Sequence, residues 1–313
     1  MSSADSLQFS RSGKVVIYIS LALSLLLVLG VLFGARIVFD RATSQPVAMS
    51  DLPAPLSDTA ECARLIDDLP DEVLGHDRAE IIEPVPAGVA AWASSSIERV
   101  TLRCGVDLPN QYDEYSDPIE IDGVRWLQIR DATPQSTLET WYTVDRSHVV
   151  AITADGPTMD GADNPVADLS EAVATLPTEN RRPAPAPLSQ LAGGDTTVCT
   201  PLMDNLPDTL TEDYTRIDVD EAHTAAWTAP GLEPVVLRCG VAPPENYRPG
   251  EQLNQVNDIP WFEDTVLANA TTSSTWFALG RATDIAVNLP QAAGSSAIVE
   301  LGELIVEHTP EQE

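Results

Sequence analysis

The four cysteines are the residues whose spacing specifies their chemistry most clearly. Cys62 and Cys199 each begin a Cys-x-x-Leu stretch that ends in Leu-Pro, whereas Cys104 and Cys239 each lie in Leu-Arg-Cys-Gly-Val. Four cysteines allow three disulfide connectivities. The parallel between the two sets favours the bonds Cys62–Cys104 and Cys199–Cys239. Structural disulfides in turn indicate an oxidising compartment.

Other side chains that could do chemistry are scattered. The four histidines fall in no HExxH or His-x-His pattern, and Lys14 is the only lysine, which excludes lysine chemistry beyond the N-terminal segment. The sequence has no G-x-S-x-G turn, Gly-rich phosphate loop or dinucleotide fingerprint. We therefore expect no catalytic residues, no cofactor and no metal site. An enzyme of unrecognised type remains as an alternative.

Two sets of carboxylates allow a chemical or a structural interpretation. Asp67 and Asp204 hold the same place, five residues after Cys62 and Cys199. General acid–base work needs paired carboxylates. A cap, a turn contact or an ion pair with the arginine of Leu-Arg-Cys-Gly-Val is favoured instead for both aspartates.

A polar loop carries Asp155, Asp160 and Asp163 around two glycines. Carboxylate and carbonyl oxygens in such a loop can hold calcium. The spacing is not that of an EF-hand, and the corresponding part of the later sequence lacks these acids. We therefore expect a solvated loop.

All four cysteines and all six tryptophans fall into matched pairs, which predicts one domain present twice. The matched tryptophans are Trp92 with Trp227, Trp126 with Trp261, and Trp141 with Trp276. We expect these rings to lie in the cores, although aromatic residues also serve at binding surfaces. The matched arginines, Arg103 and Arg238, point away from the apolar face of a strand. They could contribute to a binding surface, but a structural ion pair is the favoured interpretation.

The elements that position these residues follow from periodicity. Each copy opens with a short helix, because Cys62, Leu65 and Leu69 share one face, and Asp58 is placed to cap it. A strand over residues 100–106 puts Cys104 on its apolar face, so a disulfide would pin helix to sheet.

Two hairpins follow in the first copy, over residues 119–129 and 137–154, and a helix over 166–176 closes it. The second copy ends with a similar helix near residues 297–306. Helices at both ends of a run of antiparallel strands predict an α+β fold.

An uncharged apolar run extends from Val15 to Ala35 between Lys14 and Arg36. As a helix it would be about 32 Å long, enough to span a bilayer. We expect an uncleaved single-pass anchor, with a cleaved signal peptide as the alternative. The basic residues that flank the helix are nearly balanced, so they barely set its orientation in the membrane. The cysteines indicate an oxidising compartment, so we expect the two copies outside and the N-terminus inside. Gly30 and Gly34 form a GxxxG that could support a weak dimer.

These observations divide the chain into seven parts. They are a cytoplasmic tail (1–14), a transmembrane helix (15–35), a stalk (36–56), a first repeat domain (57–176), a Pro/Gly-rich linker (177–198), a second repeat domain (199–308) and a tail (309–313).

The net charge is −31, with 48 acidic and 17 basic residues. Such a surface repels nucleic acid, so we expect no nucleic-acid partner. It suits a solvated domain, a basic partner or divalent cations.

The combined motifs resemble the actinobacterial domain-of-unknown-function family 3515. The resemblance rests on Cys-x-x-Leu with Leu-Pro, then Ala-Trp, Leu-Arg-Cys-Gly-Val and a late Trp-Tyr-x-Val-Asp-Arg strand. It covers Cys62 to about Leu176 well, and the second copy departs from it after Trp261. The resemblance implies a secreted or membrane-anchored envelope protein and supplies no activity.

We therefore expect a non-catalytic accessory or interaction subunit of the cell envelope, bound to the membrane by its N-terminal helix and to another envelope or membrane protein. The alternative is a module that binds a cationic or cell-wall-derived molecule, which would need a pocket with convergent polar groups.

Overall fold

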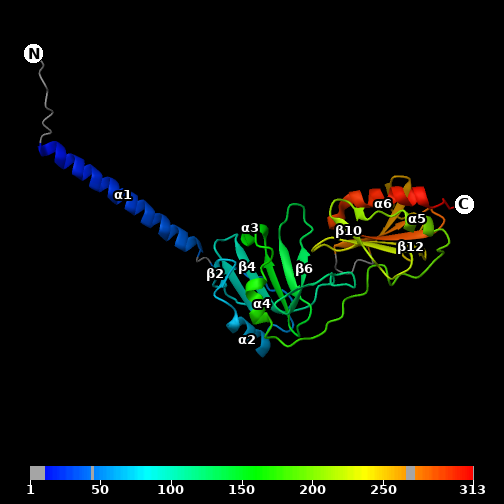
Figure 1. The fold of residues 1–313 in the computed structure, drawn as a ribbon, viewed down its shortest axis with the longest axis horizontal. Coiled ribbons are helices and arrows are strands. Elements are labelled where there is room, and N and C mark those ends of the chain that lie inside the picture. The colour runs from blue at the N-terminus through cyan, green and yellow to red at the C-terminus, as the bar shows by residue number, and fades with distance from the viewer. Residues whose placement is uncertain (1–10, 44–45, 266–271, 313) are drawn as a thin grey trace, which may run out of the picture.

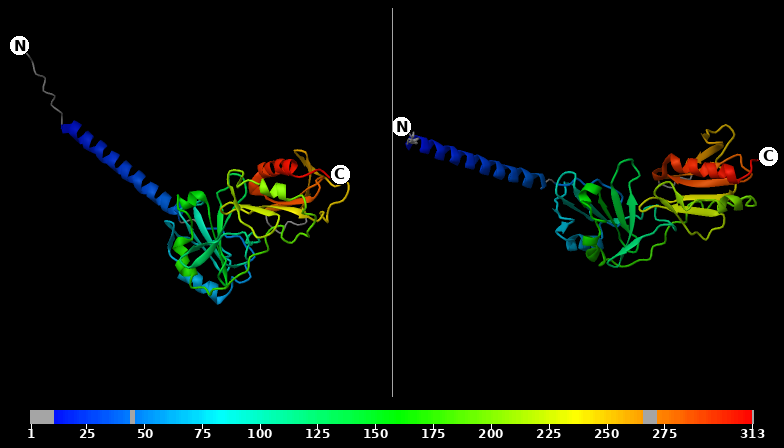
Figure 2. Two further views of the ribbon diagram at one scale, coloured as in Figure 1. Left: turned by 45° about the vertical axis from the view of Figure 1, so that its right-hand side comes forward. Right: turned by 45° about the horizontal axis from the view of Figure 1, so that its top comes forward.

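The computed structural model describes residues 11–43, 46–265 and 272–312. It shows a long N-terminal helix, α1 (Arg11–Thr43), followed by two folded units that lie against each other (Figures 1 and 2). Residues 1–10 of the predicted cytoplasmic tail and Glu313 of the predicted C-terminal tail lie outside the described residues.

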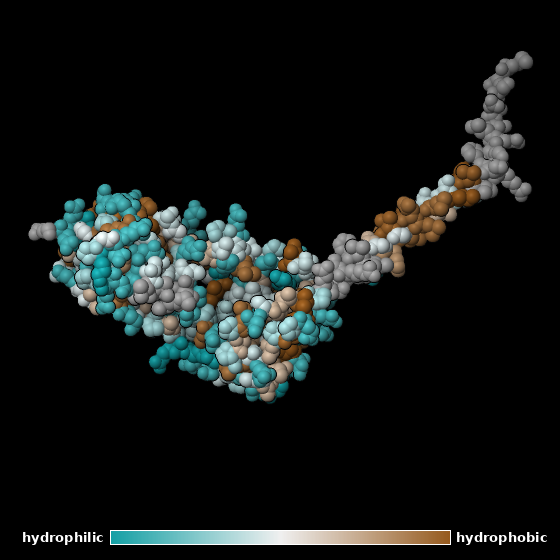
Figure 3. All heavy atoms as spheres, turned by 180° about the vertical axis from the view of Figure 1, so that it is seen from behind, coloured by the Kyte–Doolittle hydropathy of each residue, from teal (hydrophilic) through white to brown (hydrophobic). Residues whose placement is uncertain are grey.

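The apolar run forms the middle of α1. Val16–Arg36 comprises 21 residues with a mean hydropathy of 2.8, and none of it is buried. Figure 3 shows this apolar surface beside the mainly hydrophilic surface of the folded units. The helix is long and apolar enough to cross a membrane, either as an anchor or as a signal sequence.

Each copy is an antiparallel 8-stranded sheet, and both sheets have the same strand order. The first runs β1-β2-β3-β4-β8-β7-β6-β5 and the second β9-β10-β11-β12-β16-β15-β14-β13. The first sheet consists of β1 (Glu72–Val73), β2 (His76–Arg78), β3 (Val89–Ala93), β4 (Arg99–Val106), β5 (Ile119–Ile121), β6 (Val124–Arg130), β7 (Glu139–Thr143) and β8 (Val149–Ala154). The second consists of β9 (Thr209–Leu210), β10 (Tyr214–Ile217), β11 (Thr224–Thr228), β12 (Val235–Val241), β13 (Asn254–Val256), β14 (Ile259–Asp264), β15 (Ser273–Ala278) and β16 (Asp284–Pro290). The predicted duplication and α+β fold are confirmed.

Helices cover one face of each sheet (Figure 1). The first copy has α2 (Ala60–Asp68), α3 (Gly156–Met159) and α4 (Ala167–Val173), and the second has α5 (Thr200–Asp204), the 3₁₀ turn η2 (Gln291–Ala293) and α6 (Gly294–His308). The predicted cap of the first helix is one residue too early. Thr59 is the N-cap, because its hydroxyl accepts the N–H of Cys62 at 3.3 Å.

A hydrophobic core fills the space between each sheet and its helices. In the first copy, Leu65 of α2 and Leu169 of α4 meet Leu102 and Ile152 of the central strands. In the second copy, Leu202 and Leu301 take the corresponding places. Alternation along the strands sends every second side chain into these cores, so the residues between them face the back of the sheet.

The back of each sheet is covered by the segment that precedes the copy. In the first copy this segment is the predicted stalk, where Val47 forms a β-bridge with Ile81 and packs on Ala91. In the second copy it is the predicted linker, where Leu188 and Leu191 pack on the back of the second sheet. Both segments therefore belong to the folded structure of the copy that follows them.

Candidate interaction site at the junction of the two copies

Two disulfides join helix and sheet at equivalent places. Cys62 of α2 bonds to Cys104 of β4, and Cys199, the N-cap of α5, bonds to Cys239 of β12. All four side chains are at most 1% exposed. These are the pairs expected from the repeat, and their burial makes them structural cross-links.

The matched tryptophans build the cores. Five of the six are buried and the sixth, Trp276, is half-buried. The indole N–H of Trp92 donates to the carbonyl of Pro70, and that of Trp227 donates to the carbonyl of Pro207, both at 2.9 Å. This bond explains why Leu-Pro and Ala-Trp occur together in both copies. The tryptophans therefore do not form an exposed binding surface.

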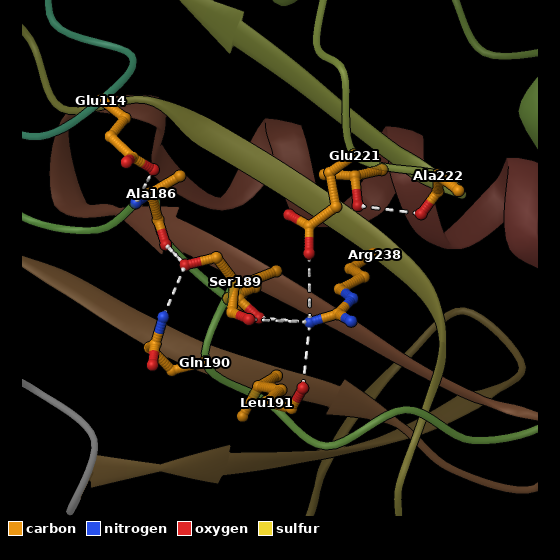
Figure 4. Close-up of polar contacts among 10 residues, drawn as sticks. Glu114, Ala186, Ser189, Gln190, Leu191, Glu221, Ala222 and Arg238 are labelled. Atoms are coloured by element: carbon orange, nitrogen blue, oxygen red, sulfur yellow. Dashed lines mark hydrogen bonds and ion pairs between the residues drawn. The ribbon is translucent and has the colours of Figure 1, made fainter.

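Arg238 fastens the linker to the back of the second sheet (Figure 4). Its guanidinium donates to the carbonyls of Leu188 at 2.8 Å and Leu191 at 3.0 Å, and it lies 3.5 Å from the carboxylate of Glu221. A planar guanidinium has several donors in fixed directions, which suits it to hold several carbonyls of one turn. Arg238 is thus a structural clamp on the linker.

Arg103 has the same role on the stalk. It donates to the carbonyl of Ser50 at 2.7 Å. Burial lowers the pKa of its guanidinium, and the nearby charge of Asp51 offsets part of this shift. The alternative that Asp67 pairs with Arg103 is wrong, because Arg103 donates to Ser50 on the back of the sheet, whereas Asp67 lies in α2 on the other face. The stated alternative of an Asp204–Arg238 pair is also wrong, since Glu221 is the carboxylate beside Arg238. Helix and back face lie on opposite sides of the sheet, which separates these groups.

Replacing Arg238 by Met should lower the free energy of unfolding by about 1–3 kcal/mol, because carbonyls of the linker and Glu221 lose their donor. Hydrogen exchange should rise in residues 188–191. Arg248→Met is the matched control, since Arg248 is exposed and its hydrogen bonds within the described residues go to carbonyls of its own turn, at Glu245 and Tyr247. Equal effects of the two substitutions would contradict the clamp.

The two copies meet through a loop of the first copy that was not singled out from sequence. Ala184 of the linker donates to the carbonyl of Tyr112 at 2.8 Å, and the carboxylate of Glu114 accepts the N–H of Ala186 at 3.1 Å. Tyr115, in the same loop, packs on the back of the second sheet beside Leu191. Burial raises the pKa of Tyr115 to about 12. The loop therefore ties both the linker and the second copy to the first.

A second contact joins β6 to the loop between β11 and β12. The N–H of Arg130 donates to the carbonyl of Gly231 at 2.7 Å. Gly231 has a φ of +71°, and a Cβ there would lie 2.6 Å from Cγ of Arg130, so glycine allows the close approach. Cavities of about 300 and 400 Å³ lie at the junction, and Glu233 lines both.

Asp113 is the buried charge of this junction. The residue is 7% exposed. Burial raises the pKa of its carboxyl group from 3.8 to about 6, and the nearby charge of Glu233 makes a smaller contribution in the same direction. The N–H of Tyr115 and the hydroxyl of Ser116 bond one carboxylate oxygen at 2.8 and 3.4 Å and partly offset this rise. A carboxylate that is ionised at pH 7 and buried without a cation destabilises the folded state.

Because its folded pKa is raised, Asp113 binds a proton more tightly in the folded than in the unfolded chain. Its ionisation therefore costs stability as pH rises from about 4 to 6, and the cost is complete near pH 7, at roughly 3 kcal/mol. Asp113→Asn should raise the free energy of unfolding at pH 7 by about 1–3 kcal/mol, and the gain should shrink at pH 5. Urea unfolding at both pH values measures it. A loss of stability at pH 7 would contradict this.

The residues of the junction were missed because they are not shared by the two copies. Asp113 and Tyr115 correspond to Arg248 and Gly250 in the later sequence. A search for matched residues finds what both copies need to fold, whereas a contact between unlike surfaces uses unmatched residues. The one available signal was the run Tyr-Asp-Glu-Tyr at residues 112–115.

The acidic loop at Asp155 has a structural role. Asp155 is the N-cap of α3, and its carboxylate accepts the N–H of Thr158 at 2.9 Å. Among the residues that the structure describes, no group of three or more His, Cys, Asp or Glu could hold a metal ion.

Fold and motifs together define a tandem α+β protein with one disulfide in each copy. The chain belongs to DUF3515, a family of proteins of unknown function, which matches it over residues 21–181 and again over 178–313. The resemblance noted from the sequence is thereby confirmed for both copies. No curated protein and no solved structure matches the chain.

Proposed function

We propose that this protein is a single-pass, membrane-anchored protein of the cell envelope whose two copies lie outside the membrane and act as a non-catalytic interaction subunit. The carrying observation is the combination of α1, with its unburied apolar run Val16–Arg36, and two buried disulfides in the domains that follow. Disulfides of this kind are typical of extracytoplasmic domains. The N-terminus then lies inside.

The distribution of shared residues supports a scaffold. Cysteines form cross-links, tryptophans fill cores, and Arg103 and Arg238 hold the preceding segments. The residues that duplication has kept in common are thus used for folding. The unmatched residues at the surface and at the junction are the ones that differ between the copies, and they are the candidates for contact with a partner.

The test is extraction of the tagged full-length protein in a mild detergent, followed by quantitative mass spectrometry of what co-purifies. The control carries residues 1–45, which precede the segment that packs on the first sheet, on an unrelated domain, so that partners of the membrane helix are subtracted. A membrane or envelope protein recovered in stoichiometric amount with the full chain alone supports the proposal. Recovery of the full chain by itself, under conditions that keep other envelope complexes intact, contradicts it.

A further inference from the structure

The larger cavity of the junction is lined by three parts of the chain. It has a volume of about 400 Å³ and lies between the Asn110–Asp113 loop of the first copy, the linker, and the back of the second sheet. This volume is within the range of small-molecule sites. Figure 4 shows three of the linker residues that line it, Ala186, Gln190 and Leu191, together with Glu114 of the first copy.

Three largely buried residues line this cavity and present acceptor atoms that a ligand could use. In the described part of the chain, Oδ2 of Asp113 receives no hydrogen bond, and neither does the hydroxyl of Thr275, whose residue is 7% exposed. Asn288 is 8% exposed and uses its amide N–H to bond the carbonyl of Pro234 at 2.9 Å, which leaves its Oδ1. These acceptor atoms open onto the cavity, where a ligand with several hydrogen-bond donors can reach all three of the residues.

The charge of the cavity is negative. Asp113 and Glu233 both line it, and no Arg or Lys is among the described residues that do. Glu233 accepts bonds from the N–H and hydroxyl of Thr272 at 2.8 and 3.0 Å and from the hydroxyl of Ser273. Among the described residues, the hydrogen bonds to both carboxylates come from neutral donors, so a cation in the cavity would be their counter-charge.

The remaining wall is apolar. Pro185, Ala186, Pro187 and Leu188 of the linker line the cavity opposite the polar atoms. An ammonium group has three donors and no acceptor, which matches three free acceptors, and an alkyl chain matches the linker wall. A metal ion fits less well, because two carboxylates fall short of the ligand set that Ca²⁺ takes.

We propose that this cavity binds the ammonium group of an alkylamine, with Asp113 and Glu233 as counter-charges and the linker against the alkyl chain. The proposal does not depend on the accessory role, since the cavity is formed by the chain alone. It gives the buried carboxylate of Asp113 a role, since ionisable groups with perturbed pKa values are common in functional sites.

The experiment titrates the full chain, in detergent, with n-butylammonium chloride and with n-butanol as the uncharged analogue, using calorimetry. We expect saturable binding of the amine and at least tenfold weaker binding of the alcohol. Asp113→Asn should weaken amine binding at least tenfold, while Asp117→Asn, which removes a nearby exposed charge outside this cavity, should leave it within twofold.

A second probe, Nα-acetyl-lysine-methylamide, distinguishes the source of the ammonium group. Tighter binding than n-butylammonium indicates a lysine side chain, and weaker binding indicates a free amine; both support the site. The proposal is overturned if the amine and the alcohol bind alike, if the amine shows no saturation at about 10 mM, or if Asp113→Asn binds as the wild type does. Urea unfolding of Asp113→Asn shows independently that the variant is folded.

Discussion

Replacing both cysteines of the second copy, as Cys199→Ala with Cys239→Ala, should lower the free energy of unfolding of that copy by about 3–4 kcal/mol. The two residues are 40 positions apart, and a cross-link that closes a loop of this length removes much freedom from the unfolded chain. For a domain of this size the melting temperature should fall by more than about 10 °C. Differential scanning calorimetry measures the change.

The control for this prediction is a reductant. Dithiothreitol should lower the melting temperature of the wild-type second copy toward that of the double variant and should leave the corresponding transition of the double variant unchanged. Both cysteines are at most 1% exposed, so reduction should require partial unfolding and should be slow. If the second copy has the same melting temperature in the double variant as in the wild type, the disulfide contributes little to the stability of that copy.

Gly105→Ala should be the most disruptive single substitution in the Leu-Arg-Cys-Gly-Val motif. Gly105 has a φ of +80°, and a Cβ there would lie 2.3 Å from the carbonyl carbon of Leu56, in the backbone that crosses the sheet. A side chain can relieve such a clash by changing rotamer, but a backbone atom cannot. The segment around Leu56 would therefore have to move away from the sheet. We expect a loss of about 3 kcal/mol or more, measured by urea unfolding.

Gly123→Ala is the matched control. Gly123 has a φ of +75°, close to that of Gly105, but nothing lies within 4 Å of the position of its Cβ. The strain of a left-handed alanine should cost only about 1–2 kcal/mol there, and the excess at Gly105 is the cost of the clash. Similar losses at the two glycines would contradict the account of the crossing segment. Gly240→Ala should have an intermediate effect, because the closest atom to its Cβ would be the side-chain methyl of Thr196 at 2.5 Å, and the closest backbone atom the carbonyl oxygen of Asp195 at 2.9 Å.

Periodicity and duplication predicted the parts of the fold that each copy forms by itself. Local patterns predicted the helix of Cys62, the strand of Cys104 and the hairpin through Asp122-Gly123. The structure contains all three. The short outer strands β1 and β2 were not predicted, because runs of two and three residues carry no period. The helices that close the two copies were predicted, but their ends differ by a few residues from those of α4 and α6. Local sequence patterns define helix ends poorly.

The junction could not be predicted, for a different reason. Its contacts join residues far apart in the chain, such as Arg130 with Gly231 and Glu114 with Ala186. Nothing in the composition of the linker distinguishes a free Pro-rich spacer from one that lies on a sheet. The clamp by Arg238 depends on carbonyls of the linker backbone, which any sequence would supply.

The most direct test of the proposed location is the state and accessibility of the four cysteines in intact cells. Cells are quenched with acid, and the protein is treated with a maleimide polymer before and after reduction, while a parallel sample of spheroplasts is exposed to protease. We predict that no cysteine reacts until reductant is added and that protease removes the two copies. Four reactive thiols, with both copies protected from protease, would place the domains inside and contradict the account.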